Sequence, residues 1–357
     1  MLTITEFRIA RDDLSRATIA HREVVVGDGE ILCSIDRFAL TANNITYAAH
    51  GVDMKYWDFF PAPEGWGIVP VWGFADVVES RCDGVARGAR VYGYWPMATH
   101  AVLAPVKVTP RGFVDGTAHR SGLATVYNGY QIVDADVGDA NVGDANVGDE
   151  RAYALFRPLF LTSFLLSDVY GAAAATFVLS SASSKTALGM AHGLRAKGRT
   201  VVGLTSAGNV DFVAATGMYS SVLAYDALAS LVRGPTIYVD FAGDRGLRRA
   251  VHTHFGGDLV QSIVVGDTHV GTADSDGALP GVRPEFFFAP THLQSRIRDH
   301  SPGGFNDRYA ASWAEFIAAT APWLRYVEAS GADAVTAHYA AMVAGRVDPA
   351  EGVILRL

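Results

Sequence analysis

Residues 176–205 constrain the fold of this chain more than any other stretch of its sequence. They begin with a short apolar run, pass through a turn of small polar residues, and continue with apolar residues at helical spacing up to Gly198. A second apolar run follows at 201–204. Strand, tight turn, helix and strand in this order predict a βαβ unit with parallel strands and a right-handed crossover.

The turn of this unit, SSASSKTA, lies where dinucleotide-binding folds place a phosphate-binding loop at a helix N-terminus. Three glycines are typical of such a loop, and their places hold Ser181, Ser184 and Ala187. Small residues still permit close backbone approach, Ser183 or Ser184 can cap the helix, and Lys185 can bring a positive charge near a phosphate. An ordinary capped helix in a ligand-free α/β domain is the alternative.

The composition narrows the class of protein. A formal net charge of −8 without a basic block argues against a nucleic-acid partner. Because Cys33 and Cys82 are the only cysteines, neither a disulfide framework nor a cysteine-rich metal site is expected. The sequence has no apolar run of about 18 residues and no signal-peptide pattern, so we expect a cytoplasmic protein without membrane spans.

The first 110 residues predict a small, irregular β-barrel, because short strand candidates alternate with turn signals. The candidates are 4–9, 23–26, 30–35, 74–79 and 90–92. An aromatic-rich stretch at 47–72 interrupts them, and it either lines a pocket or packs beneath a long loop. A connection with a helix at 118–130 should follow.

Residues 135–149 contain three tandem pentads, ADVGD followed by two copies of ANVGD. Repeats of this composition cannot bury a core, so we expect an exposed loop. A calcium site is the alternative, but neither the ligand spacing of an EF-hand nor the paired glycines of β-helix repeats are present.

Beyond the repeat, strand and helix patterns alternate, as in a doubly wound parallel sheet. Further strands are expected at 222–225, 236–241, 259–265 and 285–290, and helical segments at 151–175, 210–216 and 246–255. Residues 305–345 show helical spacing, and 352–357 should form a strand that joins one of the sheets.

Three stretches resemble the medium-chain dehydrogenase/reductase superfamily. Residues 28–44 resemble the first strand pair and substrate loop of its GroES-like domain, 69–94 the segment after it, and 176–265 its cofactor domain. More narrowly, the motifs SSASSKTA, GLTSAGN, YWDFF and FFFAP resemble a divergent branch known mainly as a domain of unknown function. The resemblance implies an α/β architecture with a GroES-like irregular β-barrel domain at 1–125 and 291–357 and a Rossmann-type doubly wound domain at 126–290.

Alcohol dehydrogenases of this superfamily hold a catalytic zinc ion with cysteine, histidine and a further cysteine or carboxylate. The corresponding places in this chain hold Phe38 or Ala39, Trp72 and Gly73, none of which can bind zinc. The four-cysteine structural zinc lobe is absent as well. The chain therefore resembles the zinc-free quinone and enone reductases.

The end of the second strand of the βαβ unit favours NADP over NAD. A carboxylate there would bind the ribose hydroxyl of NAD, whereas this chain has Thr-Ser-Ala-Gly-Asn at 205–209. Hydroxyls and an amide can bind a 2′-phosphate, with Lys185 as the source of positive charge; a plain polar turn is the alternative. The expected cofactor-binding residues are Ser181, Ser183, Ser184, Lys185, Thr186, Thr205, Ser206, Asn209, Phe241, Ala242, Val264 and Val265.

In the related reductases, the segment after the first strand pair lies over the nicotinamide. This implies that Tyr56, in the aromatic loop, is the proton donor, with Asn44 as a positioning residue and Tyr47 as a second candidate donor. Simple packing is the alternative for each tyrosine.

These features predict a zinc-independent, NADP(H)-dependent oxidoreductase that transfers a hydride to an activated C=C or C=O of a quinone- or enone-like small molecule. A non-catalytic NADP(H)-binding sensor or interaction protein is the alternative, and the glycine-free turn favours it. A lyase or isomerase that uses bound NADP transiently is a third. The expected partner is a small-molecule substrate rather than a nucleic acid or a membrane, and a homodimer is compatible with the pattern.

Overall fold

The computed structural model describes residues 1–133, 149–265 and 279–357, which fall into two compact units. The β-rich unit comprises the described residues up to 158 together with 325–357. The parallel-sheet unit comprises the described residues of 159–324. The pentad repeat predicted to form a loop at 135–149 lies outside the described residues, apart from Asp149.

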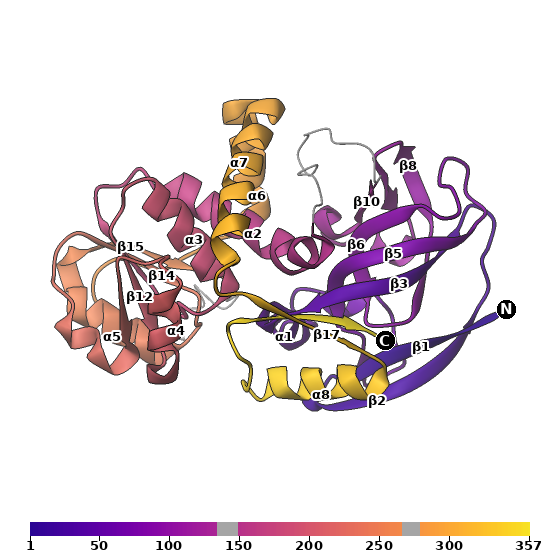
Figure 1. Ribbon diagram of the computed structural model, residues 1–357, viewed down its shortest axis with the longest axis horizontal. Coiled ribbons are helices and arrows are strands. Elements are labelled where there is room, and N and C mark those ends of the chain that lie inside the picture. The colour runs from indigo at the N-terminus through magenta and orange to yellow at the C-terminus, as the bar shows by residue number, and fades with distance from the viewer. Residues whose placement is uncertain (134–148, 266–278) are drawn as a thin grey trace. The chain divides into compact units, whose positions relative to one another are not determined.

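Eighteen strands and eight α-helices lie within the described residues. The strands of the β-rich unit are β1 (Leu2–Ala10), β2 (Asp13–Val24), β3 (Ile31–Leu40), β4 (Trp66–Gly67), β5 (Pro70–Ser80), β6 (Arg90–Pro96), β7 (His100–Leu103), β8 (Pro105–Thr109), β9 (Gly112–Asp115), β10 (Gly129–Val133), β17 (Arg325–Ser330) and β18 (Glu351–Arg356). The smaller sheet has the order β2-β1-β4. The larger has the order β17-β18-β3-β5-β6-β10-β9-β8, with β7 paired to β3 (Figure 1).

Short helices fill the connections of this unit. They are α1 (Ala42–Ala49), α8 (Ala332–Val343) and the 3-10 helices η1 (Tyr56–Asp58), η2 (Ala118–Arg120) and η3 (Thr125–Tyr127). Figure 1 shows α8 alongside β2, where the ring of Tyr339 meets Phe7 edge-on at a centroid distance of 5.3 Å.

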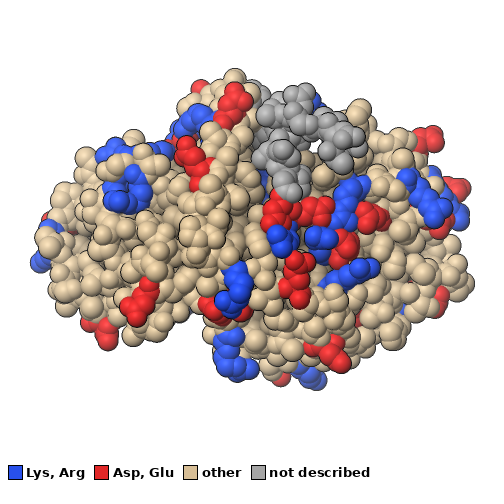
Figure 2. Space-filling view, viewed as in Figure 1, with Lys and Arg blue, Asp and Glu red and all other residues tan. Residues whose placement is uncertain are grey.

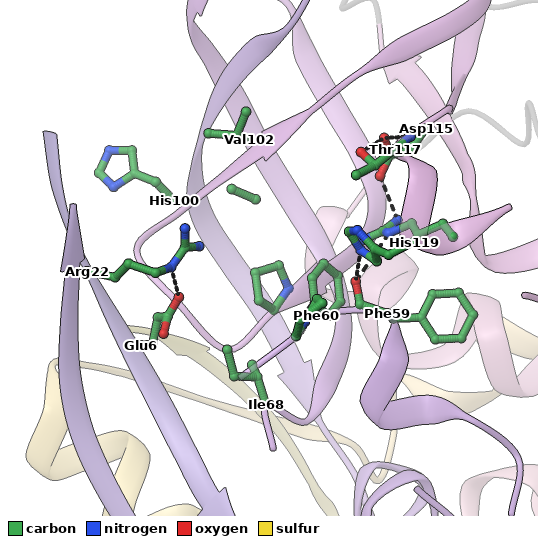
Figure 3. Close-up of a pocket in the computed structure, with 14 residues that line it drawn as sticks. Glu6, Arg22, Phe59, Phe60, Ile68, His100, Val102, Asp115, Thr117 and His119 are labelled. Carbon is green, nitrogen blue, oxygen red and sulfur yellow. Dashed lines mark hydrogen bonds and ion pairs between the residues drawn. The ribbon is translucent and has the colours of Figure 1, made fainter. Parts of the chain in front are cut away.

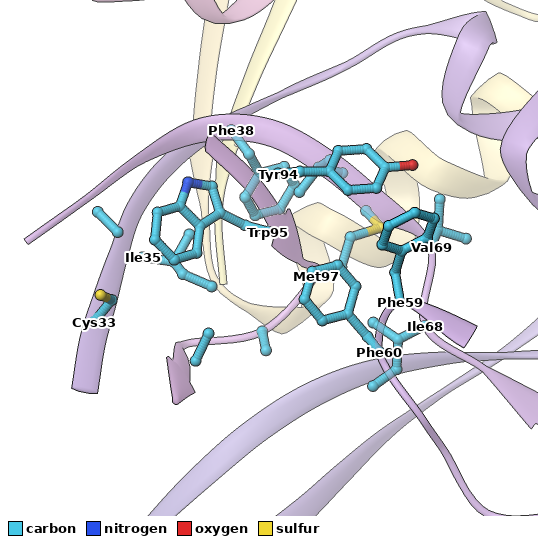
Figure 4. Packing of buried hydrophobic residues seen from close by; sticks show 14 of the residues in the cluster. Cys33, Ile35, Phe38, Phe59, Phe60, Ile68, Val69, Tyr94, Trp95 and Met97 are labelled. Atoms are coloured by element: carbon cyan, nitrogen blue, oxygen red, sulfur yellow. The ribbon is translucent and has the colours of Figure 1, made fainter. Parts of the chain in front are cut away.

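Large apolar side chains from β3, β6 and the aromatic loop meet in one buried core. Figure 4 shows Phe38, Phe59, Trp95 and Met97 packed together. The Trp95 indole N–H donates to the Gly73 carbonyl oxygen at 3.0 Å, so this ring is buried with its polar group satisfied. Through Phe59, the aromatic-rich stretch 47–72 is therefore packed onto this core.

The predicted terminal strand is present as β18. It pairs antiparallel with β3, where Val353 lies opposite Leu40, and parallel with β17. The end of the chain therefore completes the larger sheet of the β-rich unit.

The second unit contains a six-stranded sheet whose described pairings are all parallel. Its strands are β11 (Thr176–Leu179), β12 (Val201–Thr205), β13 (Ser221–Ala224), β14 (Thr236–Asp240), β15 (Leu259–Val264) and β16 (Glu285–Phe286). Their order is β13-β12-β11-β14-β15-β16, the doubly wound order of dinucleotide-binding folds. The predicted α/β fold class is confirmed, and the order reverses between β11 and β14.

The helices that lie wholly in this unit are α3 (Lys185–Ala196), α4 (Val210–Ala215), α5 (Arg245–Phe255), α6 (Ala289–His300) and α7 (Pro302–Thr320), with 3-10 helices η4 (Ala207–Asn209), η5 (Tyr225–Ser230) and η6 (Gly256–Asp258). Figure 1 shows α3 and α5 on opposite faces of the sheet. One face packs Val178 and Tyr238 against Val251 and Phe255 of α5.

The long helix α2 (Glu150–Tyr170) runs from one unit into the other. Arg90 holds the first residue of α2 in place, because its guanidinium donates to Glu150 at 2.6 Å and to Asp36 of β3 at 2.7 Å. Among the described residues, α2 alone is long and apolar enough to cross a membrane by length and composition. Because 67% of its apolar window is buried inside the protein, α2 is a core helix.

Three predicted elements differ from the structure. The helix expected at 118–130 is replaced by η2, η3 and β10, because Gly129 starts a strand that pairs with β6 and β9. The helical pattern at 305–345 contains β17, which forms by pairing with the distant β18. The strand expected at 285–290 is the two-residue β16, since a helix begins at Ala289.

Candidate functional site

The serine-rich turn joins β11 to α3 and is held by its own hydrogen bonds. The Ser184 N–H donates to the Ser181 carbonyl oxygen at 2.8 Å. The Ser184 hydroxyl caps α3 by accepting from the Ala187 N–H at 3.3 Å, so Ser184 is the cap that the sequence left open between two serines. Ala187, in the third glycine place, is fully buried, and a small side chain there lets the helix lie close to the sheet.

Ser181, in the first glycine place, has a φ of 48°, in the left-handed region. Glycine adopts this conformation freely, whereas an L-residue with a side chain pays roughly 1–2 kcal/mol for it. The turn has thus kept the backbone shape of a glycine loop without the glycine. Strain of this kind persists where the surroundings enforce it, and it concentrates at ligand sites.

Tyr225, which the sequence analysis missed, enforces this shape from the neighbouring η5. Its hydroxyl oxygen accepts from the Ser181 N–H at 3.2 Å. Burial raises the pKa of the phenol, so the hydroxyl stays neutral at physiological pH. The ring lines an open hollow of about 500 Å³ together with Ala242, Asp244 and Leu247. The available signal was a Tyr as the last residue of the predicted strand 222–225.

The first two residues of α3 are Lys185 and Thr186. Their N–H groups belong to the first helical turn, which carries the positive end of the helix dipole. The Thr186 carbonyl oxygen accepts from the Ser163 hydroxyl at 2.7 Å, which ties this turn to α2. The arrangement favours an anion at the start of α3.

The end of β12 lies beside the serine-rich turn. The Asn209 side-chain amide donates to the Ser183 hydroxyl at 3.2 Å, which joins two residues that were predicted from separate turns. Thr205 is buried, and Ser206 is exposed. The pair Ser183–Asn209, with Ser206 next to it, is therefore the polar surface that this edge of the sheet offers to a ligand.

A buried polar cluster fills the point where the strand order reverses. The Ser180 hydroxyl donates to Asp240 Oδ1 at 2.9 Å, and Arg248 Nε donates to Asp240 Oδ2 at 2.8 Å. All three side chains are buried. The sequence analysis missed this cluster, although an Asp at the end of the buried strand 236–240 was a signal for it.

This cluster fixes the turn after β14. The Phe241 N–H donates to Ser180 Oγ at 2.9 Å, and the Ala242 N–H donates to Ser180 Oγ and to Asp240 Oδ1, both at 3.0 Å. Because these N–H groups bond within the protein, Phe241 and Ala242 would meet a cofactor with their carbonyl oxygens and side chains.

The last predicted cofactor contacts lie at the end of β15. Val264 is fully buried, and its carbonyl oxygen accepts from the Phe287 N–H at 2.9 Å. Val265 lies one residue further, and its N–H donates to the Asp240 carbonyl oxygen at 3.0 Å. Val264 is therefore the last residue of β15, and Val265 is the first residue beyond it.

In the β-rich unit, an aromatic cluster surrounds the predicted proton donor. The ring centroid of Tyr56 lies 4.6 Å from that of Tyr47, and the Tyr56 hydroxyl is 3.3 Å from the Tyr127 hydroxyl. Tyr127 in turn packs on Tyr94 at 4.7 Å. The Trp72 indole N–H donates to the Tyr47 hydroxyl at 3.4 Å. Tyr94 and Tyr127 were not predicted, because their partners are far away in the sequence.

Burial controls the ionisation of these phenols. Removal from water raises the pKa of Tyr56, which is 7% exposed, and it also raises the pKa of Tyr47. Both are therefore neutral hydroxyls at physiological pH and can donate a proton. The residue before Tyr56, Lys55, has a φ of 59°, so a strained backbone also sets the position of this tyrosine.

Asn44 is buried and fully engaged by the fold. Its side-chain oxygen accepts from the Thr41 N–H at 2.7 Å, and its amide donates to the Pro70 carbonyl oxygen at 2.9 Å. The first bond belongs to a capping box at the start of α1. Asn44 thus positions α1, and through that helix Tyr47, rather than presenting a free amide.

A smaller cavity of about 100 Å³ also lies within the β-rich unit (Figure 3). The charges on its wall are matched within the wall: Glu6 accepts from Arg22 at 2.8 Å, and Asp115 pairs with Arg120 at 3.1 Å. Since these charges neutralise one another, we assign this cavity no ligand.

No group of three or more His, Cys, Asp and Glu side chains that could hold a metal ion occurs among the described residues. Trp72 and Gly73, which were predicted to stand in the places of zinc ligands, take part in packing. Trp72 stacks on Tyr92 at a centroid distance of 5.7 Å, and a Cβ at Gly73 would lie 2.1 Å from the Arg37 carbonyl oxygen.

On the face that Figure 2 shows, acidic and basic side chains are interspersed.

Solved structures with the same fold include a protein described as a quinone oxidoreductase and proteins described in complex with NADPH or NADP. The quinone oxidoreductase from Coxiella burnetii is 12% identical, with a TM-score of 0.61 over 100% of both chains. CurA from Vibrio vulnificus in complex with NADPH is 12% identical, with a TM-score of 0.59 over 98% of both chains. The Etr1p/NADP/crotonyl-CoA complex is 10% identical, with a TM-score of 0.57 over 99% of this chain and 100% of that one.

Identities this low show a shared fold, and they confirm the predicted resemblance to the medium-chain dehydrogenase/reductase superfamily at that level. No curated protein matches the sequence. The family model described as "Protein of unknown function (DUF2855)" matches residues 38–348, and the chain belongs to that family.

Proposed function

We propose that this protein is an NADPH-dependent oxidoreductase that reduces an activated C=C or C=O of a quinone- or enone-like small molecule without a metal ion. The observation that carries the proposal is the serine-rich turn at the reversal of a doubly wound sheet, with Ser181 held at a positive φ. Ligands of such sheets bind outside the carboxyl ends of the strands at this reversal. CurA, which shares the fold, is described in complex with NADPH.

The residues around the turn fit a phosphorylated dinucleotide. The start of α3 offers N–H groups and Lys185 to phosphates, and the pair Ser183–Asn209 offers hydrogen bonds without a carboxylate that would repel a 2′-phosphate. This distribution supports NADPH over NADH.

The aromatic cluster supports the reductive chemistry. Bound NADPH would supply a hydride to one atom of the substrate double bond. Tyr56 would give its hydroxyl proton to the other atom, and the O–H electron pair would stay on Tyr56 as a phenolate that water later reprotonates. The surrounding rings exclude water from the hydroxyl, Tyr47 is the second candidate donor, and Asn44 keeps the helix that carries Tyr47 in place.

Calorimetry with NADPH and NADH tests the cofactor assignment. We expect NADPH to bind more tightly, and equal affinities or no binding of either would overturn it. NADPH oxidation with crotonyl-CoA and with a naphthoquinone then tests the chemistry. Tyr56→Phe keeps the ring, so turnover should fall by about 10²–10⁴-fold while NADPH affinity stays the same.

A non-catalytic NADPH-binding protein is the second candidate, and the burial of both candidate donors favours it. Tyr56 is 7% and Tyr47 5% exposed, so a substrate must approach hydroxyls that the fold largely covers. NADPH binding without oxidation by any quinone, enone or aldehyde would support this candidate.

A further inference from the structure

Tyr127 stands out in the aromatic cluster because its hydroxyl meets that of Tyr56. It ends η3, where its N–H donates to the Ala124 carbonyl oxygen at 3.1 Å. Its ring is clamped by Tyr94 at 4.7 Å and by Phe59 at 5.3 Å. With both the backbone and the ring held, the hydroxyl has a fixed place 3.3 Å from that of Tyr56.

The direction of this hydrogen bond depends on the state of Tyr56. While both phenols are neutral, either hydroxyl can donate. Once Tyr56 has lost its proton, its oxygen can only accept, and Tyr127 is then the donor. A hydrogen bond to a charged oxygen stabilises it by about 1.5–3 kcal/mol, more than a bond between neutral groups.

We propose that Tyr127 is a positioning residue for Tyr56, donating a hydrogen bond to the phenolate that Tyr56 becomes when it delivers its proton. This inference rests on the proposed function, since it assigns a partner to the proton donor of that reaction. The proton that leaves Tyr56 forms the new C–H or O–H bond of the product, and the O–H electron pair remains on Tyr56. Tyr127 keeps its own proton, and water restores that of Tyr56.

The ionisable groups around Tyr56 are consistent with this role. They come from three elements: Tyr47 from α1, Tyr94 from β6 and Tyr127 from η3. Burial raises the pKa of Tyr94 and Tyr127 well above that of an ordinary tyrosine, so neither loses its proton to Tyr56. The hydrogen bond from Tyr127 lowers the pKa of Tyr56 against the opposing effect of burial. The positive charge of Arg120, from η2, opposes the effect of burial on the pKa of Tyr94.

The test is Tyr127→Phe in the full chain, with Tyr339→Phe as the matched control. Tyr339 is a buried tyrosine of the same unit, and its hydroxyl has no hydrogen-bond partner among the described residues. Protein labelled at the tyrosine ζ carbons is titrated by NMR, and the Tyr56 signal is the one lost in Tyr56→Phe. This readout needs neither NADPH nor a substrate.

We expect Tyr127→Phe to raise the ionisation midpoint of Tyr56 by about 1–2 pH units, the equivalent of a charged hydrogen bond. Tyr339→Phe should leave it unchanged. A midpoint that moves no further in Tyr127→Phe than in the control overturns the proposal.

Turnover separates this inference from the proposed function. With crotonyl-CoA or a naphthoquinone as the probe, kcat of Tyr127→Phe should fall while KM for NADPH stays the same, because only the state after proton delivery is affected. A shifted midpoint with an unchanged kcat overturns the catalytic part. If the wild-type protein oxidises NADPH with neither probe, the proposed function fails and the catalytic part falls with it, while the titration still decides the hydrogen bond.

Discussion

Arg248→Met removes the cation from the buried cluster at the strand-order reversal. Nε of Arg248 lies 2.8 Å from Asp240 Oδ2, and the two side chains are 2% and 0% exposed. Loss of one partner of a buried pair typically costs 3–5 kcal/mol, because the other charge stays buried. Asp240 would still accept from the Ser180 hydroxyl and from the N–H groups of Ala242 and Gly243. We therefore expect a loss of about 3 kcal/mol, at the lower end of that range.

Urea denaturation followed by circular dichroism measures this loss. Arg81→Met is the matched control: its guanidinium lies 3.0 Å from Glu79, but the two side chains are 49% and 45% exposed. An exposed pair contributes about 0–1 kcal/mol, so this variant should be nearly as stable as the wild type. Adding Asp240→Asn to Arg248→Met removes the uncompensated charge and should recover about 1–2 kcal/mol.

The binding site provides a second readout for Arg248→Met. The turn after β14 is held through Asp240 and Ser180, so its loosening should also weaken NADPH binding. If Arg248→Met unfolds at the same urea concentration as Arg81→Met, the pair does not stabilise this unit and the reasoning is refuted.

Three further predictions test other parts of the molecule. Lys185→Ala should weaken NADPH binding by about one to two decades, the worth of a lost charged contact, and should affect NADH less; calorimetry that shows equal losses would contradict a role at the 2′-phosphate. Reductase activity should survive chelators, and elemental analysis should find no stoichiometric zinc; one zinc ion per chain would overturn the assignment of Trp72 and Gly73 to packing. Ser181→Gly should be at least as stable as the wild type, and Ser181→Val should be less stable than Ser181→Gly by more than about 1 kcal/mol, because a β-branched residue is strained at a φ of 48°; equal thermal midpoints would contradict this.

The βαβ unit could be predicted from the sequence because its signals are local. The apolar runs and the helical spacing of 176–205 became β11, α3 and β12, with Ser184 as the cap. Strand, turn and helix propensities all favour the same structure there, and each acts over a few residues.

Elements that depend on distant partners could not be predicted in the same way. Residues 325–330 became β17 because they pair with β18, more than 20 residues later, and their own spacing is compatible with a helix. Residues 129–133 became β10 because β6 and β9 flank them. Tertiary pairing decides such segments, whereas propensity is a weak guide.

The same distinction between local signals and distant partners applies to the residues of the candidate site. Ser183 and Asn209 were predicted separately from two turns, and only the fold shows the 3.2 Å bond between them. Tyr127 was missed because it lies 71 residues from Tyr56 in the chain. Asn44 was predicted as a positioning residue, a role that the capping box supports without testing it.

The bonds between turns explain how a loop without glycine could bind the dinucleotide that we propose. Three of the four serines of the turn are tied to other elements: Ser180 to the end of β14, Ser181 to Tyr225, and Ser183 to Asn209. A glycine loop lets its backbone lie close to a ligand, but ordering it costs much conformational entropy. The loop of this chain is ordered by the neighbouring elements before a ligand binds. Because the loop then loses less conformational entropy when a ligand binds, fewer direct phosphate contacts suffice for the same affinity. On this reasoning Tyr225 and Asn209 would contribute to the proposed NADPH binding by holding the turn, even where they do not touch the nucleotide.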